Sequence, residues 1–188
     1  GDDWRMDGAA WPTADVFNTT MGNLFLGKEA ATITAWIRPN TAIINTSAGA
    51  IWRTSVTNVG SSKFRLDLVV NGGVVVLRVG GRSDAADGWH FQYGTTNLAT
   101  ASSNGNNWIQ VGGIIDLAND LFYEIVNGVR TSIGAIGAAN TRFDASTART
   151  QIGSDSSNPA KAFIYQLDLY TKTLSEEECK MVYHRDLA

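Results

Sequence analysis

Residues 30–38 of the chain read AATITAWIR, and Pro39-Asn40 follows them. Within this run Ile33, Ala35 and Ile37 occupy every second position and alternate with Thr32, Thr34 and Trp36. A period of two residues is typical of a strand whose two faces meet different surroundings. Because Pro and Asn are turn residues, the run predicts a strand that ends at a turn.

The same type of signal recurs along the chain. Two pairs of apolar runs flank short turns that favour positive φ: Lys63–Val70 and Val74–Val79 around Asn71-Gly72-Gly73, and Leu121–Val126 and Val129–Ile133 around Asn127-Gly128. Both predict β-hairpins. Three further runs predict strands: Trp108–Asp116, Gln151–Gly153 and Ala162–Tyr170. Many short strands at this spacing, without a linker or repeat, predict one all-β sandwich or barrel domain over residues 1–188.

One helix is predicted, at the C-terminal end. Ser175 and Glu178 form a capping box, in which each side chain bonds the other residue's backbone N–H. Leu174 and Cys179 stand at the staple positions, and Cys179 is expected to be a small buried apolar residue. We expect this helix to plug a sheet edge or one end of the sandwich.

Composition and charge exclude several classes of function. The net charge is −3 and no run of Lys or Arg occurs, which argues against nucleic acid as a partner. The apolar runs are too short to insert into a membrane. The single cysteine excludes an intrachain disulfide, which favours a bacterial or viral origin over a secreted animal module. Since the chain begins at Gly1 without a signal peptide, we expect a processed product or part of a longer protein.

Three groups of segments, taken in order, resemble a known family. They are Thr32–Pro39; Asn107–Gly112 with the hairpin Tyr123–Gly128; and Gln151–Ser154 with Phe163–Tyr170 and Thr173–Glu178. Their order resembles that of the laminin-G-like, concanavalin A-like lectin/glucanase domains of bacterial and phage proteins. The stretch Arg5–Gly8 also resembles the opening strand of that family. The resemblance implies a two-sheet antiparallel jelly roll that binds glycans, sometimes with calcium, and serves as a module of adhesins, glycosidases or virions. Tyr165 and Gln166 stand where the family often has an acidic residue, which weakens the expectation of calcium.

Catalytic and metal chemistry find little support in the sequence. Glycoside hydrolysis needs two nearby carboxylates, and the five glutamates supply no such pair at strand spacing, so we expect no enzyme activity. The sequence predicts no cofactor and no metal-binding residues. Calcium remains an alternative through turn acids, which are Asp2, Asp3, Asp7, Asp84, Asp87 and the loop Asp155–Asn158.

Aromatic residues supply the candidate ligand site. Trp89, Phe91 and Tyr93 alternate and so share one face, where sugar rings could stack if the face is open. Trp11 and Trp52 complete this set of candidate ligand-binding residues. The alternative is that the set forms ordinary core packing or a protein interface. Trp36 and Trp108 lie in strands that match the family, and we interpret them as core.

Two non-catalytic functions remain open. The first is a structural or assembly module on a phage or virus particle: a capsid-decoration, spike or fibre protein. Low charge and the apolar segments Thr41–Ile51 and Ser132–Asn140 favour it, since they predict contacts with other subunits or a homo-oligomer. The alternative is a lectin-like adhesion module that binds cell-surface glycans. The two functions predict a location on the virion surface or outside the cell.

Overall fold

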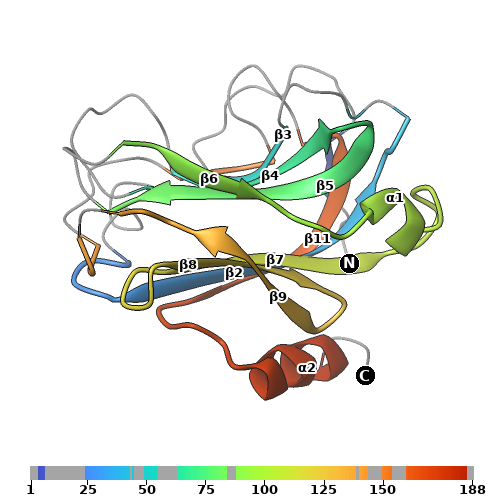
Figure 1. The fold of residues 1–188 in the computed structure, drawn as a ribbon. Coiled ribbons are helices and arrows are strands. Elements are labelled where there is room, and N and C mark those ends of the chain that lie inside the picture. The colour runs from blue at the N-terminus through green and yellow to red at the C-terminus, as the bar shows by residue number, and fades with distance from the viewer. Residues whose placement is uncertain are drawn as a thin grey trace.

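A computed structural model describes residues 4–6, 24–42, 44, 49–54, 63–83, 88–138, 140–143, 150–153 and 160–185. Its strands form two antiparallel sheets that pack face to face (Figure 1). The six-stranded sheet has the order β1 (Trp4–Met6), β11 (Ala162–Tyr170), β2 (Ala30–Pro39), β7 (Ile109–Asp116), β8 (Leu121–Val126) and β9 (Val129–Ala135). The five-stranded sheet has the order β10 (Thr150–Ile152), β3 (Gly49–Thr54), β4 (Lys63–Asn71), β5 (Val74–Arg82) and β6 (His90–Tyr93). The predicted jelly-roll sandwich is confirmed.

Strand β2 lies inside the six-stranded sheet, between β11 and β7. Ile33, Ala35 and Ile37 are buried in the main core between the sheets, as the alternation predicts. The opposite face of the strand carries Thr32 and Trp36, which are also buried. Both faces of β2 are therefore covered, one by the other sheet and the other by the C-terminal segment.

Both predicted hairpins form with two-residue loops. Val126 pairs with Val129 around Asn127 and Gly128, whose φ angles are 49° and 77°. Asn71 pairs with Val74 around Gly72 and Gly73, with φ angles of 57° and 83°. Two successive positive φ angles give the turn a twist that matches the strands, and Asn and Gly adopt them at little cost.

The helix α2 (Glu176–Arg185) lies against the outer face of the six-stranded sheet, not at a sheet edge or at the end of the sandwich as predicted (Figure 1). Ile114 and Ile125 are buried on that outer face and pack with Leu174 and Cys179. These two isoleucines make the outer face apolar, and the helix covers it. Trp36 stacks on Tyr183 of α2, with ring centroids 5.5 Å apart.

The capping box and the buried cysteine of α2 are confirmed. Ser175 N–H donates to Glu178 Oε2 at 2.9 Å, and Glu178 N–H donates to Ser175 Oγ at 3.2 Å. Cys179 is buried, and this burial raises the pKa of its thiol to about 11. A short helix, α1 (Leu98–Ala101), was not expected from the sequence; the Asn97 side chain caps it. Among the residues that the structure describes, no helix is long and apolar enough to cross a membrane.

Two tryptophans differ in part from their predicted positions. Trp108 was expected in the core, but it is only partly buried and contacts Phe163 and Tyr165. It immediately precedes the inward-facing Ile109, so the pleat turns its side chain to the outer face. Trp36 is buried as predicted, although beneath α2 rather than between the sheets.

Candidate functional site

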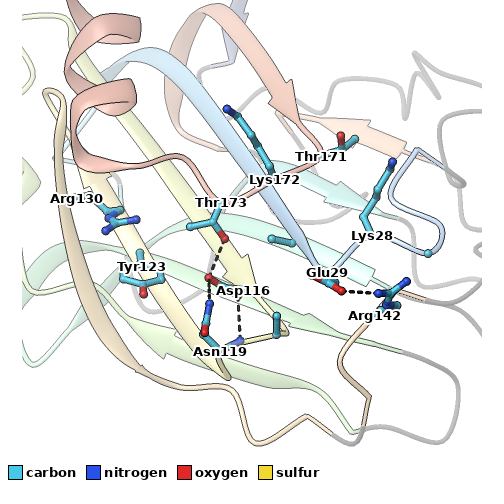
Figure 2. A pocket seen from close by; sticks show the side chains of 13 residues that line it. Lys28, Glu29, Asp116, Asn119, Tyr123, Arg130, Arg142, Thr171, Lys172 and Thr173 are labelled. Carbon is cyan, nitrogen blue, oxygen red and sulfur yellow. Dashed lines mark hydrogen bonds and ion pairs between the residues drawn. The ribbon is translucent and has the colours of Figure 1, made fainter.

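A polar pocket of about 600 Å³ opens at the end of the six-stranded sheet where β2 begins. Four connections contribute to it: the residues before β2, the turn from β7 to β8, the segment after β9 that carries Arg142, and the link from β11 to α2. Tyr123 of β8 and Arg130 of β9 complete the lining. Its lining side chains include Lys28, Glu29, Asp116, Asn119, Tyr123, Arg130, Arg142, Thr171, Lys172 and Thr173 (Figure 2). The volume falls within the usual range of small-ligand sites.

Asp116 is the buried centre of the pocket, and its carboxylate is fixed by neutral donors. Asn119 donates to it twice, from the backbone N–H at 3.1 Å and from Nδ2 at 3.0 Å. Thr173 Oγ1 donates to Asp116 Oδ2 at 2.8 Å. Asp116 ends β7, so its side chain can hydrogen-bond the turn that follows, as Asp commonly does. This bonding joins the β7–β8 turn to the link before α2.

Cations surround this centre, and most already have a partner. Arg142 Nη2 lies 2.5 Å from Glu29 Oε1. Lys172 pairs with Glu178 of α2. Arg130 donates to the backbone carbonyl of Leu174 at 2.8 Å, with its guanidinium 4.7 Å from the centroid of the Tyr123 ring.

Lys28 differs from the other cations that line the pocket. Over the ranges that the structure describes, its ammonium group has neither an ion-pair nor a hydrogen-bond partner, whereas Arg130 donates to a backbone carbonyl and Arg142 and Lys172 meet carboxylates. Figure 2 shows Lys28 beside the Glu29–Arg142 pair, with Asp116 and Thr173 farther into the pocket. One wall of the pocket therefore carries a mobile, strongly hydrated donor next to a fixed ion pair.

The pocket offers fixed acceptors beside fixed donors. A carboxylate accepts up to about four hydrogen bonds and a guanidinium donates five, so Glu29 and Arg142 keep bonding capacity beyond their mutual contact. A sugar hydroxyl donates one hydrogen bond and accepts two. Adjacent hydroxyl groups can therefore donate to Glu29 and accept from Arg142 or Lys28. Tyr123 adds an aromatic ring to the same pocket.

The residues predicted from aromatic spacing lie elsewhere, on β6 of the other sheet. Phe91 and Tyr93 share one face of the strand as expected, with ring centroids 5.8 Å apart, and Phe91 is 46% exposed. The Arg78 guanidinium lies 5.2 Å from the centroid of the Phe91 ring. Trp89, just before β6, is partly buried. The stacking of a sugar ring on this aromatic face therefore stays a prediction.

Two further tryptophans were predicted to be ligand-binding residues, Trp52 and Trp11. The structure places Trp52 in the core, and Trp11 lies outside the described residues. Trp52 is 1% exposed and belongs to the main core, so its ring has no face open to a ligand. The β3–β4 register shifts between Ala50 and Trp52, and this irregularity places both Ile51 and Trp52 in the core. Simple alternation along β3 does not reveal it.

Sequence reasoning missed the pocket, because its residues come from segments far apart in the chain. One local signal was available: Asp116 and Asn119 flank the turn between two predicted strands. The acids named as calcium alternatives, Asp2, Asp3, Asp7, Asp84, Asp87 and those of loop 155–158, lie outside the described residues. Within the described part of the chain, no group of three or more His, Cys, Asp or Glu side chains is placed to hold a metal ion.

Comparisons with solved structures show the same fold. One similar structure is the native heptameric SAP-like pentraxin from Limulus polyphemus, with a TM-score of 0.61 and 13% identity over 85% of this chain and 71% of that one. Another is the ligand binding domain of botulinum neurotoxin serotype D in complex with N-acetylneuraminic acid, with a TM-score of 0.63 and 16% identity over 88% and 38% of the two chains. The chain thus spans well under half of the neurotoxin domain.

Comparisons of sequence give the family. No curated protein sequence matches significantly. The model of the concanavalin A-like lectin/glucanases superfamily of laminin-G type matches residues 12–180. The sequence segments that resembled this family include a hairpin and the start of the C-terminal helix, and the structure contains both. Because this match covers most of the 188 residues, the chain belongs to the concanavalin A-like lectin/glucanase superfamily.

Proposed function

We propose that this chain is a non-catalytic glycan-binding module and that the pocket of Figure 2 is its saccharide site. The observation that carries the proposal is the set of acceptors and donors that Asp116, Glu29 and Arg142 bring to one pocket, with Asp116 held in place by three hydrogen bonds. Such a set suits several hydroxyl groups on one sugar ring. Preorganised partners also reduce the entropy that binding would otherwise cost.

The comparisons support the same class of ligand. The family includes lectins by name, and a structure of similar fold was solved with N-acetylneuraminic acid. Because the chain corresponds to only 38% of that neurotoxin domain, the fold similarity alone does not assign its sugar site to the shared part. The pocket itself therefore provides the main argument.

A glycan array probed with this chain tests the proposal, followed by calorimetric titration of the best glycan. Arg142→Ala removes a donor that is 64% exposed, so the fold should tolerate it. Asn119→Ala removes the side-chain donor to Asp116 and leaves the backbone N–H donor of residue 119 in place. We expect each variant to bind about tenfold more weakly. Lys180→Ala, on the exposed side of α2, is the matched control and should bind normally.

Two results would contradict the proposal. One is an array without any bound glycan. The other is a bound glycan whose affinity is the same for Arg142→Ala, Asn119→Ala and the unmodified chain. If Phe91→Ala abolished binding instead, the aromatic face of β6 would be the site, as the sequence first suggested.

An assembly role on a virion surface is a second candidate, favoured by one observation. Most of the described residues of the apolar segment Ser132–Asn140 are not buried, and the first part of the segment belongs to β9, the last strand in the order of the six-stranded sheet. An edge strand can pair with a strand of another subunit. Light scattering of the purified chain tests this role: a homo-oligomer that Ala135→Lys, at an exposed position of β9, dissociates would support it, and a monomer at all concentrations would count against self-assembly.

A further inference from the structure

A second, smaller cavity of about 300 Å³ lies at the opposite end of β2 from the pocket of Figure 2. It is lined by Arg38–Asn40 at the end of the strand, by Asn104–Asn106 from the link between α1 and β7, and by Phe163. Ten residues of strand span about 30 Å, so the two sites are separate. Neither the family relationship nor the proposed function assigns a role to this cavity.

The sheet register places Arg38 among aromatic rings. Arg38 is directly opposite Phe163 of β11, and Trp108 precedes Ile109, which is opposite Ile37. The guanidinium carbon of Arg38 lies 4.3 Å from the centroid of the Phe163 ring and 5.6 Å from that of Trp108. Stacking of this kind holds a guanidinium by its face and leaves its N–H groups directed outward in the plane.

The N–H groups of Arg38 have no protein acceptor among the residues that the structure describes. Other arginines of this part of the chain differ, since each meets an acceptor: Arg65 and Arg78 meet Asp67, Arg142 meets Glu29, and Arg185 meets Asp168. Arg38 therefore combines a fixed position with unused donors. That combination fits an anionic ligand better than a structural role.

The opposite wall of the cavity is held in place by local hydrogen bonds. Gly105 has a φ of 83°, and a Cβ added there would lie 2.2 Å from the Pro39 carbonyl oxygen, so only glycine fits. Gly105 N–H donates to Ser102 Oγ at 3.0 Å, and Asn106 Nδ2 donates to the Ser103 carbonyl at 2.8 Å. This close approach brings the asparagine-rich link beside the end of β2.

We propose that this cavity binds the oxyanion of an acidic saccharide, with Arg38 as the residue that recognises the carboxylate or sulfate group. A guanidinium fork matches the two oxygens of such a group. Asparagine amides can hydrogen-bond sugar hydroxyls on the other wall. Tyr165, which is 57% exposed and has its ring centroid 6.2 Å from that of Trp108, extends the aromatic surface on which a sugar ring can stack.

NMR titration of the chain with D-glucuronate, D-glucose 6-sulfate and D-glucose tests the proposal. The indole N–H of Trp108 is the reporter, because its ring lies beside the Arg38 guanidinium. We expect either acidic sugar, or both, to shift this signal in a saturable way, and neutral glucose to leave it unchanged. The two acidic probes separate a carboxylate site from a sulfate site.

Arg38→Gln should weaken binding of the acidic sugar by about tenfold or more, since one charge-assisted fork is lost. Arg38→Lys keeps the charge without the fork and should bind with intermediate affinity. Asn40→Ala is a second variant that leaves the backbone hydrogen bond from Asn40 N–H to the Lys161 carbonyl in place, and it should also bind more weakly. Lys180→Ala, on the exposed side of α2 and outside both cavities, is the control and should leave the Trp108 titration unchanged.

Three results would overturn the proposal: no response to either acidic sugar, an equal response to glucose, or equal affinity in Arg38→Gln. Tighter binding of a short peptide that ends in aspartate would also overturn it and assign the cavity to a protein partner. Failure of this proposal can be distinguished from failure of the proposed function. The Trp108 signal and Arg38→Gln report on this cavity, whereas Arg142→Ala and Asn119→Ala report on the pocket of Figure 2.

Discussion

Glu124 of β8 holds Thr95 through both polar groups of that residue. Its Oε1 accepts from Thr95 N–H at 2.9 Å and from Thr95 Oγ1 at 2.8 Å. Thr96 adds two further hydrogen bonds to the same oxygen. Since Glu124 is fully buried, it ties the segment after β6, in one sheet, to the interior of the other sheet.

Glu124→Ala should therefore destabilise the fold by about 3 kcal/mol, because it removes a buried carboxylate that accepts four hydrogen bonds from Thr95 and Thr96. Glu124→Gln keeps one carbonyl oxygen and should cost less. Urea unfolding followed by tryptophan fluorescence measures both. Glu177→Gln, at an exposed position of α2, is the matched control and should change the unfolding free energy by less than about 0.5 kcal/mol. If Glu124→Ala lowered the unfolding free energy no more than this control does, Glu124 would not tie the segment after β6 to the other sheet.

The ion pairs of Asp67 should be far stronger than those at the surface. Asp67 is fully buried between Arg65, at 2.6 Å, and Arg78, at 2.7 Å. Asp67→Ala removes the buried carboxylate that both partly buried guanidinium groups contact and should cost about 3–5 kcal/mol in unfolding free energy. Glu29→Gln breaks an exposed pair and should cost less than about 1 kcal/mol. Similar losses of unfolding free energy for the two variants would show that burial does not strengthen the ion pairs of Asp67.

Much of the fold followed from local patterns, and the pocket did not. Period-two alternation located β2, and the Asn-Gly turn located the β8–β9 hairpin. Those signals act over a few residues. The burial of Trp52 does not follow from a local pattern, because the sequence predicts no strand at residues 49–54 and the β3–β4 pairing is irregular. Glu29 and Arg142, 113 positions apart in the chain, meet only through the sheet topology.

The sequence predicts which side chains share a face of one strand, but not which side chains meet across strands. Phe91 and Tyr93 lie on one strand, so their spacing fixes their common face. The contact of Arg38 with Phe163 and Trp108 needs the register of three strands that are distant in sequence. The sequence contains each of these residues, but not the order in which β11, β2 and β7 lie side by side.

The capping box should contribute measurably to stability. Ser175→Ala removes the acceptor for Glu178 N–H and should lower the unfolding free energy by about 1 kcal/mol. Ser175→Asp replaces that acceptor and should restore most of the loss, since aspartate also caps helices well. Thermal unfolding followed by circular dichroism measures both variants. An unchanged midpoint for Ser175→Ala would show that packing of Leu174 and Cys179 alone holds the helix.

The Cys179 thiol should be unreactive in the folded chain. Only the thiolate reacts with disulfide reagents, and a rise of the pKa to about 11 lowers the thiolate fraction at pH 8 by about a hundredfold relative to an ordinary cysteine. Burial also blocks access of the reagent. We expect the thiol to react with Ellman's reagent at the rate of global unfolding, and at once in denaturant. Because the folded state holds this proton more tightly, its contribution to stability is present below about pH 9 and is lost as the pH rises toward 11. Fast labelling of the folded chain at pH 8 would contradict the burial of Cys179 between α2 and the six-stranded sheet.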